Sequence, residues 1–296
     1  GEIIGHRDAW SAGVNVAGIR VRGASARIRV EGTRFEDLSS NGIGVFGAKG
    51  QPIRDVQLRD VVCVNCCNYY GDYLSAISGP AKGSEREDQG GVAFYHVEDW
   101  VVSESRFEAS QSDGTHFYES HHGRFVDNRV LDSRMGGYFL EGCEHVLASG
   151  NLISNNGSRG VTIERDSRFC TLADNVIECS GREGLWAPDV ASILVTGNIF
   201  LDNGRKDDGD RDAEIRLDER PKWTTETADV RIHGNLFYTT SGQERIIYAG
   251  PGVRDVVVEN NSFRGPAQPL HCPQPDTAEA AAPAAVLRRN NDTGGC

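Results

Sequence analysis

One short phrase, a polar residue followed by alternating apolar positions, returns along this chain at a nearly constant interval. Its polar anchor residues are Ser105, Asn128, Asn151, Asn175, Asn198, Asn235 and Asn261. Their successive spacings are 23, 23, 24, 23, 37 and 26 residues. Self-similarity at such a period indicates stacked structural units, each burying its apolar face only against its neighbours, rather than one compact globular core.

Each unit contains three strand-like segments. One begins with a glycine, as in GVAFY from Gly91, GTHFY from Gly114 and GYFLE from Gly137; a second precedes the anchor asparagine, as in HVLAS and CTLAD; the third follows it. These segments alternate apolar and other residues, which is the period of a half-buried β-strand. The pattern predicts an all-β chain, 1–296, folded as one single-stranded right-handed parallel β-helix of roughly 9–11 coils.

The asparagines are expected to be structural. Equivalent positions of consecutive coils stack about 4.8 Å apart, so inward Val, Ile, Leu and Phe form continuous apolar columns. An inward asparagine can hydrogen-bond the asparagines of the coils above and below it, and it tolerates the left-handed backbone of a turn. The repeat therefore explains the core and leaves function to the outer face and to the irregular segments.

The repeat also predicts the boundaries. Regular coils should extend over about 12–265, with an irregular coil or loop at 68–90, loop insertions at 203–228 and a C-terminal cap at 266–296. The first insertion carries four aspartates, Asp207, Asp208, Asp210 and Asp212, whose carboxylates could bind calcium. The alternative for this segment is a solvated charged loop, since it lacks an EF-hand pattern.

Charge and hydropathy exclude some partners. The net charge of −12 argues against nucleic acid and favours a neutral partner, or an anionic one bridged by a cation. No apolar run approaches the roughly 18 residues of a membrane span, and the first residues are not a signal peptide. We therefore expect a soluble chain whose leader has been removed, located in a secreted, periplasmic or cell-surface setting.

The cysteines are not expected to form a metal site. Cys63, Cys66 and Cys67 form a C-x-x-C-C cluster, but no second ligand pair with zinc-like spacing follows it. Buried thiols or a local disulfide are favoured at this cluster. A disulfide is expected between Cys272 and Cys296, which bracket the C-terminal tail.

The string GGYFLEGCEHVLASGNLISNNG, Gly136 to Gly157, resembles the generic repeats of mannuronan epimerases within the right-handed parallel β-helix superfamily. The superfamily also includes pectate-lyase-like enzymes, polygalacturonase-like hydrolases, alginate lyases and phage tailspikes. The resemblance implies a protein that binds or processes a polysaccharide. However, the Asp-Pro-His string of the epimerases and the paired aspartates and Gly-His-Gly of polygalacturonases are absent, so no single activity is implied.

Aligning the glycine-led strands predicts two outward columns. The first contains Tyr95, Tyr118, Glu141, Glu164 and Pro188, with Glu164 displaced by one residue because its coil has 24 residues. The second contains Ala93, His116, Phe139, Thr162 and Trp186. Aromatic rings beside charged groups on a rigid sheet suit a sugar chain, although exposed strand faces are polar in every β-helix. His121 and His122 follow at a turn, where they either border the groove or face solvent. The residues expected to contact a glycan are Tyr95, Phe139, Trp186, Glu214, Arg216, Asp218, His121 and His122.

Two chemistries compete on this strip. Glu141 and Glu164 on adjacent coils would hold carboxyl groups about 5 Å apart, as in a retaining glycosidase, and their repulsion would raise one pKa. The alternative is lyase or C5-epimerase action on a uronate, with Tyr118 or His116 as base and Arg165 or calcium neutralising the substrate carboxylate. A non-enzymatic glycan-binding rod is the third possibility. We expect a monomer or homotrimer and no required cofactor, with calcium as an optional ion.

Overall fold

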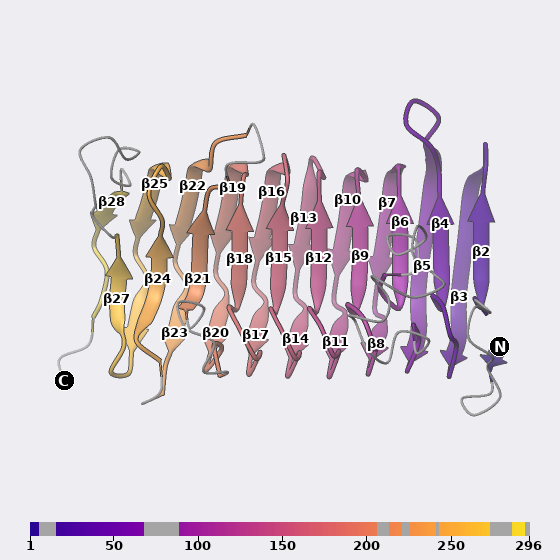
Figure 1. Cartoon of the computed structure of the whole chain (residues 1–296), viewed down its shortest axis with the longest axis horizontal. Helices are drawn as coiled ribbons and strands as arrows, with labels where there is room; N and C mark the ends of the chain where they lie inside the picture. The colour runs from indigo at the N-terminus through magenta and orange to yellow at the C-terminus, as the bar shows by residue number, and fades with distance from the viewer. Residues whose placement is uncertain are drawn as a thin grey trace.

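The computed structural model describes residues 1–5, 16–67, 89–205, 213–220, 225–240, 243–272 and 286–293. Within these ranges every regular element is a β-strand, and no helix long and apolar enough to span a membrane is present. The strands form two stacks of parallel strands that follow one helical path, with the two chain ends at opposite ends of the rod (Figure 1). The all-β parallel β-helix predicted from the repeat is confirmed.

One stack, here called sheet I, has ten strands, one from each coil. Its strands in order are β2 (Ile19–Arg22), β4 (Ile43–Phe46), β6 (Val92–Tyr95), β9 (Thr115–Tyr118), β12 (Tyr138–Glu141), β15 (Val161–Glu164), β18 (Leu185–Pro188), β21 (Ala213–Asp218), β24 (Arg245–Ala249) and β27 (Gln268–His271).

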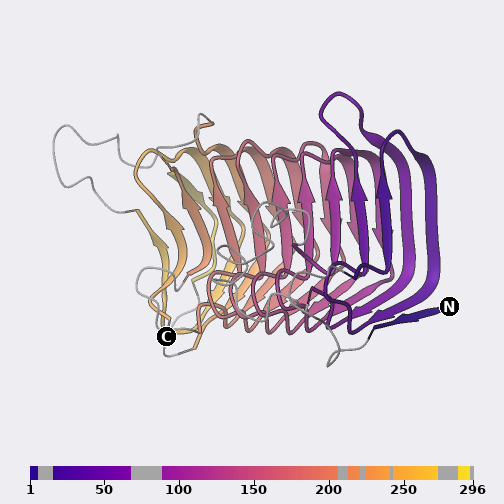
Figure 2. The ribbon, with the colours of Figure 1, turned by 45° about the vertical axis from the view of Figure 1, so that its right-hand side comes forward.

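The other stack, sheet II, has eighteen strands and bends around the remaining sides of each coil (Figure 2). Its strands are β1 (Glu2–Ile4), β3 (Ala26–Glu36), β5 (Ile53–Val64), β7 (Val97–Ser103), β8 (Arg106–Glu108), β10 (His121–Val126), β11 (Arg129–Leu131), β13 (Val146–Ser149), β14 (Leu152–Ser154), β16 (Arg168–Ala173), β17 (Val176–Glu178), β19 (Ala191–Thr196), β20 (Ile199–Leu201), β22 (Ala228–His233), β23 (Leu236–Tyr238), β25 (Arg254–Glu259), β26 (Ser262–Arg264) and β28 (Val286–Arg289).

The core consists of apolar columns that run along the helix axis. One column follows the strand register through Phe35, Cys63, Phe107, Val130, Ile153, Ile177, Phe200, Phe237 and Phe263, and every member is buried. Its last three rings stack face to face at centroid distances of 5.1 and 5.2 Å. The in-register spacing of parallel strands thus stacks apolar side chains of equivalent positions directly on one another.

The anchor asparagines form a buried ladder at one turn of each coil. The Oδ1 atom of Asn151 accepts the backbone N–H of Asn128 at 2.9 Å and its side-chain amide at 3.2 Å. The Asn151 amide in turn donates to the Phe125 carbonyl at 2.9 Å and to Asn175 at 2.8 Å. The residue before each asparagine has a positive φ, for example Asp127 at 57° and Asp174 at 55°. The predicted structural role of the asparagines is confirmed.

The predicted irregular segments lie partly outside the described residues. These include most of 68–90 and the four aspartates Asp207, Asp208, Asp210 and Asp212. Beyond residue 265 the coil path continues, since β27 pairs with β24 and β28 pairs with β25 in parallel.

The described cysteines are free thiols. Cys63, Cys66 and Cys67 are buried, as the interpretation as buried thiols requires. Cys272 is also free, and its expected partner Cys296 lies outside the described residues.

Candidate functional site

A pocket of about 320 Å³ lies on the outer face of sheet I, over β12, β15 and β18. Its walls come from consecutive coils because in-register strands place their outward side chains next to one another. The lining residues are Gln89, Asp113, Met135, Gly136, Phe139, Glu141, Ser158, Arg159, Thr162, Glu164, Arg165, Trp186 and Arg220. We call this the main pocket.

Two carboxylates stand side by side at one end of the main pocket. Glu141 and Glu164 are direct register partners on β12 and β15, and each is only 3% exposed. The predicted displacement of Glu164 by one residue is wrong. The additional residue of its coil lies in the corner between β15 and β16, where Arg165 and Asp166, both with positive φ, replace the single Gly142 of the preceding coil. A corner absorbs an insertion at less cost than the hydrogen-bonded strand register.

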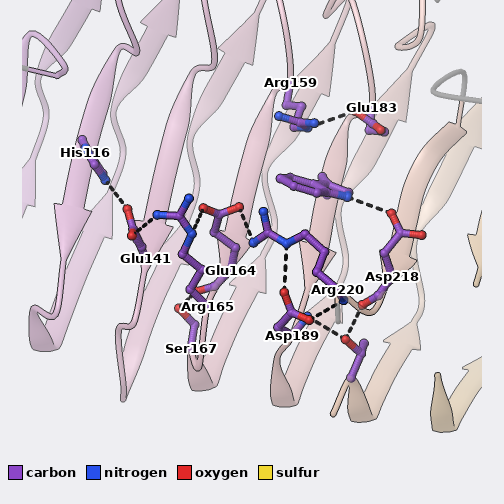
Figure 3. Close-up of polar contacts among 12 residues, drawn as sticks. His116, Glu141, Arg159, Glu164, Arg165, Ser167, Glu183, Asp189, Asp218 and Arg220 are labelled. Atoms are coloured by element: carbon purple, nitrogen blue, oxygen red, sulfur yellow. Dashed lines mark hydrogen bonds and ion pairs between the residues drawn. The ribbon is translucent and has the colours of Figure 1, made fainter. Parts of the chain in front are cut away.

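The residue gained in that corner, Arg165, joins the two carboxylates (Figure 3). Its Nη1 contacts Glu141 Oε1, and its Nε lies 3.0 Å from Glu164 Oε1. Arg220 approaches Glu164 from the other side, with Nη2 3.0 Å from Oε2. Positive guanidinium groups and negative carboxylates therefore alternate along the pocket wall, which offsets the cost of burying the charges.

Arg220 reaches this wall from the loop after β21. Its backbone N–H donates to Asp189 Oδ1 at 2.7 Å, and its Nε lies 2.9 Å from Asp189 Oδ2. Asp189 is itself buried and accepts from both the main chain and the side chain of Arg220. The loop is thereby fixed against the end of β18, and the arginine is held in one orientation (Figure 3).

A buried relay fixes Glu141 from the other side. The Tyr95 hydroxyl lies 3.1 Å from His116 Nδ1, and His116 Nε2 lies 3.3 Å from Glu141 Oε2. Both contacts are satisfied when the tyrosine hydroxyl donates to Nδ1 and the Nε2–H donates to Glu141. In this arrangement Glu141 accepts a hydrogen bond from His116, and Tyr95 fixes the orientation of the imidazole.

Burial raises the pKa of two carboxyl groups of the pocket, those of Glu164 and Asp113. It raises the pKa of Glu164, with a further upward contribution from Glu141, while Arg165 and Arg220 oppose the rise. Burial also raises the pKa of Asp113 to about 6. The two glutamates of the pair thus differ in environment, which is the usual basis for dividing acid and nucleophile roles between carboxylates.

The aromatic side chains of the face present less free ring surface than expected. The Phe139 ring stacks on His116 at 4.4 Å, and the Arg159 guanidinium lies 3.7 Å from the Trp186 ring centroid, with that of Arg220 at 4.9 Å. Trp186 also donates its Nε1–H to Asp218 at 3.0 Å. The faces of the Phe139 and Trp186 rings are therefore covered at least in part by other side chains of the protein.

The expectation that Tyr95 is exposed is wrong. Tyr95 points outward from β6 but is 5% exposed, since it stacks with Phe46 at 5.3 Å and packs against Ala93 and Tyr118. His116 is completely buried between Tyr95 and Phe139. Neither residue lines the main pocket or an adjoining smaller one, so both support Glu141 from within the face.

A smaller pocket of about 240 Å³ adjoins the main one. Its lining residues are Lys49, Tyr118, Glu119, His121, Glu141, Gly142, Glu144, Arg165, Asp166 and Arg168, and we call it the corner pocket. His121 Nδ1 accepts the Glu144 N–H at 3.1 Å, and burial lowers the pKa of His121, so the ring is neutral near pH 7 with its hydrogen on Nε2. His122 instead lies exposed outside both pockets, stacked on His145 at 5.3 Å.

The prediction that Glu214 contacts a ligand is wrong. Glu214 is completely buried, and its carboxylate accepts the Asn203 N–H at 3.1 Å and the Asn203 side-chain amide at 2.6 Å. It completes a second ladder of turn residues that includes Asn156 and Asn203. Arg216 and Asp218 lie on the outer face as expected, paired at 2.5 Å, but beyond the lining of either pocket.

Sequence reasoning missed Asp113, Arg159 and Arg220, which line the main pocket, and Asp189, which holds Arg220 in place. Asp113 precedes the glycine that opens a repeat, a position that a repeat alignment could have identified. Arg220 lies in an insertion without repeat pattern, so no signal placed it. Within the described ranges, no three His, Cys, Asp or Glu side chains are grouped so that they could hold a metal ion.

Comparison with known proteins defines the class. The model of the family described as the right handed beta helix region matches residues 90–263, which is more than half of the chain. The protein therefore belongs to the right-handed β-helix family. No curated protein sequence matches it.

Solved structures share the fold at low sequence identity. A double mutant of the periplasmic alginate epimerase AlgG superposes with a TM-score of 0.60 at 12% identity, over 90% of this chain and 69% of that one. An alginate lyase from Paenibacillus gives 0.56 at 13%, over 91% and 96%. The Dettilon tailspike protein gives 0.64 at 14%, over 97% of this chain and 52% of its own. Identities this low establish the fold and not the activity.

Proposed function

We propose that this protein hydrolyses a polysaccharide bound in the main pocket, with Glu141 and Glu164 as the catalytic pair. The observation that carries the proposal is the direct register of two buried carboxylates on adjacent strands of sheet I. Neighbouring strands lie 4.7–4.9 Å apart, close to the carboxyl separation of retaining glycosidases. Support also comes from polysaccharide-related proteins that share the fold, an alginate lyase, an alginate epimerase and a tailspike crystallised with a pentasaccharide.

The two carboxylates would divide the chemistry between them. Glu141, held as an anion by His116 and Arg165, would attack the anomeric carbon. Glu164, whose pKa is raised by burial, would donate its proton to the leaving glycosidic oxygen and later accept a proton from the attacking water. The product would keep the anomeric configuration of the substrate.

The test compares the variants Glu141→Gln and Glu164→Gln with Glu104→Gln, which removes an exposed carboxylate in the turn between β7 and β8. Each is incubated with a panel of neutral and uronate polysaccharides, and released reducing ends are measured. We expect both site variants to lose about 10³-fold in rate and the control to keep full activity. Near-wild-type rates in either site variant would refute the pair. Proton NMR of the first product should show retained configuration.

A second function is supported by the corner pocket. Tyr118, the neutral His121 and Arg165 line it together, which are the residue types that abstract a proton from C5 of a uronate and neutralise its carboxylate. We propose β-elimination or C5-epimerisation of a uronate polymer as the alternative reaction. Only elimination gives a product that absorbs in the ultraviolet, and only epimerisation changes C5 without releasing a reducing end.

A polysaccharide substrate also supports the location that we propose for the protein, in the periplasm or outside the cell. Extracellular polysaccharides meet a protein in the periplasm or outside the cell, and a relative of the same fold is periplasmic. Sedimentation velocity would distinguish a monomer from the homotrimer that a rod of this kind could form.

A further inference from the structure

The main pocket and the corner pocket share two residues, Glu141 and Arg165. The main pocket lies over the strands of sheet I, and the corner pocket lies over the turns that follow those strands, at Glu119, Gly142 and Asp166. From Gly136 to Glu144 the lining advances along a single coil, at about 3.3 Å for each extended residue. The lining of the main pocket also extends along the axis, from Gln89 to Arg220. The corner pocket adds to it across the width of the sheet, so the two pockets together form a path transverse to the axis.

Side chains obstruct the outer face along the axis in both directions. Towards the N-terminus Phe139 is followed by the buried side chains of His116 and Ala93. Glu141 is followed by Tyr118, which is half-buried, and then by the buried Tyr95. Towards the C-terminus Arg159 and Arg220 lie over the Trp186 ring, which is fixed to Asp218. A polymer parallel to the axis would have to displace these packed groups, whereas the corner pocket is already open.

Asp113 marks the end of the main pocket opposite Glu141. It precedes β9, is 4% exposed, and its Oδ1 accepts the Gly136 N–H at 2.8 Å. Among the described residues its Oδ2 has no hydrogen-bond partner, although Asp113 lines the pocket. A side chain on Gly136 would approach Asp113 Oδ1 to 2.9 Å, so the glycine keeps this carboxylate accessible. A buried carboxylate oxygen without a partner is an acceptor for a ligand hydroxyl group.

We propose that a glycan chain crosses sheet I transversely, from Asp113 at one end, over Glu141 and Arg165, to the corner pocket beside Arg168. Asp113 binds a sugar hydroxyl group, and Arg168 with His121 binds the part of the chain beyond the reaction centre. This inference rests on the proposed function for its ligand. Its consequence is that sugar units occupy both sides of the catalytic pair, so an internal bond of the polymer is attacked.

The test uses Glu141→Gln protein as a non-cleaving background and two probe ladders of two to eight units, cello-oligosaccharides and oligogalacturonates. Affinity is measured by titration calorimetry after adding Asp113→Asn or Arg168→Ala at the two ends. Tyr248→Ala is the matched control, since Tyr248 lies on the same face further along the axis, in register with Arg216. Thermal melts confirm that each variant is folded.

We expect Asp113→Asn and Arg168→Ala each to weaken binding of hexamers at least 10-fold, and Tyr248→Ala to leave it within 2-fold. The Arg168 effect should vanish for the shortest ligands, which fill one pocket only. Loss of affinity in Tyr248→Ala with none in the two end variants would overturn the transverse path. Arg168 is partly exposed, and its Nε lies 3.6 Å from Glu144 Oε1 and donates to the Asp166 carbonyl at 3.4 Å, so this variant loses only surface contacts and should fold even if Asp113→Asn does not.

The two proposals fail in different ways. If Asp113→Asn and Arg168→Ala weaken binding and Tyr248→Ala does not, but the wild-type protein does not cleave that glycan, hydrolysis is refuted and the transverse path stands. If the glycan is cleaved, but Tyr248→Ala weakens binding and the two end variants do not, hydrolysis stands and the transverse path is refuted. Absence of binding to both ladders overturns the glycan ligand and the path together.

Discussion

The buried carboxyl group of Glu214 should make the stability of the folded protein depend on pH. Burial raises its pKa from 4.5 to about 7, although Asn203 donates two hydrogen bonds to it. The folded state therefore holds the proton more tightly than the unfolded state does, so this contribution to stability is complete below pH 4.5 and is lost as the pH rises through 7. The loss is of order 3 kcal/mol.

We expect Glu214→Gln to flatten this dependence. In urea melts, the free energy of unfolding of the wild type should fall more between pH 5 and pH 8 than that of the variant, by about 2–3 kcal/mol. The exposed Glu104→Gln variant should follow the wild type. Parallel curves for Glu214→Gln and the wild type would show that Glu214 does not titrate in this range.

Arg220 offers a second prediction at the scale of one residue. Since Arg220 lowers the pKa of Glu164, its removal should raise that pKa further and keep the acid protonated to higher pH. The alkaline limb of the pH–rate profile should therefore move to higher pH in Arg220→Ala. Arg106→Ala, on sheet II, is the control. An unmoved limb would mean that Glu164 is not the proton donor.

At the scale of the element, the asparagine ladder makes the coils interdependent. Asn175 accepts from the Asn151 N–H and amide and donates to Ala148 and Asn198. Asn175→Ala leaves several of these buried groups unpaired and should cost about 3 kcal/mol or more of unfolding free energy. Asn155→Ala, at an exposed position nearby whose φ of 56° also disfavours alanine, should cost only about 1 kcal/mol in the same urea melts. Equal losses at the two positions would contradict a structural ladder.

The elements were predictable where they repeat and unpredictable where they do not. The anchor asparagines and outward columns follow from a period that every coil must obey, so they could be identified by alignment alone. The burial of Tyr95 could not be predicted in this way, because it depends on the side chains of neighbouring coils. The predicted register of Glu164 was wrong because a sequence alignment cannot show whether an additional residue lies in a strand or in a corner. The Arg220 contact is set by tertiary packing of a non-repeating loop.

At the scale of the whole molecule, each coil contacts chiefly the coils on either side, so stability should vary along the rod. Central strands such as β13, β16 and β19 are paired on both sides, whereas β2 and β27 are the terminal strands of sheet I. We expect amide hydrogen exchange to be slowest in the central coils and faster by at least 10-fold in the terminal strands. Uniform exchange along the rod would instead indicate a single cooperative unit.

The corner after β15 has a consequence for how such a molecule can change. Because Arg165 and Asp166 occupy a turn that only one residue fills in the previous coil, the chain has acquired a charged group between two carboxylates without moving a strand or a core side chain. Length variation at corners can thus alter the chemistry of the outer face while the core columns stay intact. In a fold built from repeats, new activities should arise preferentially where a coil is one residue too long.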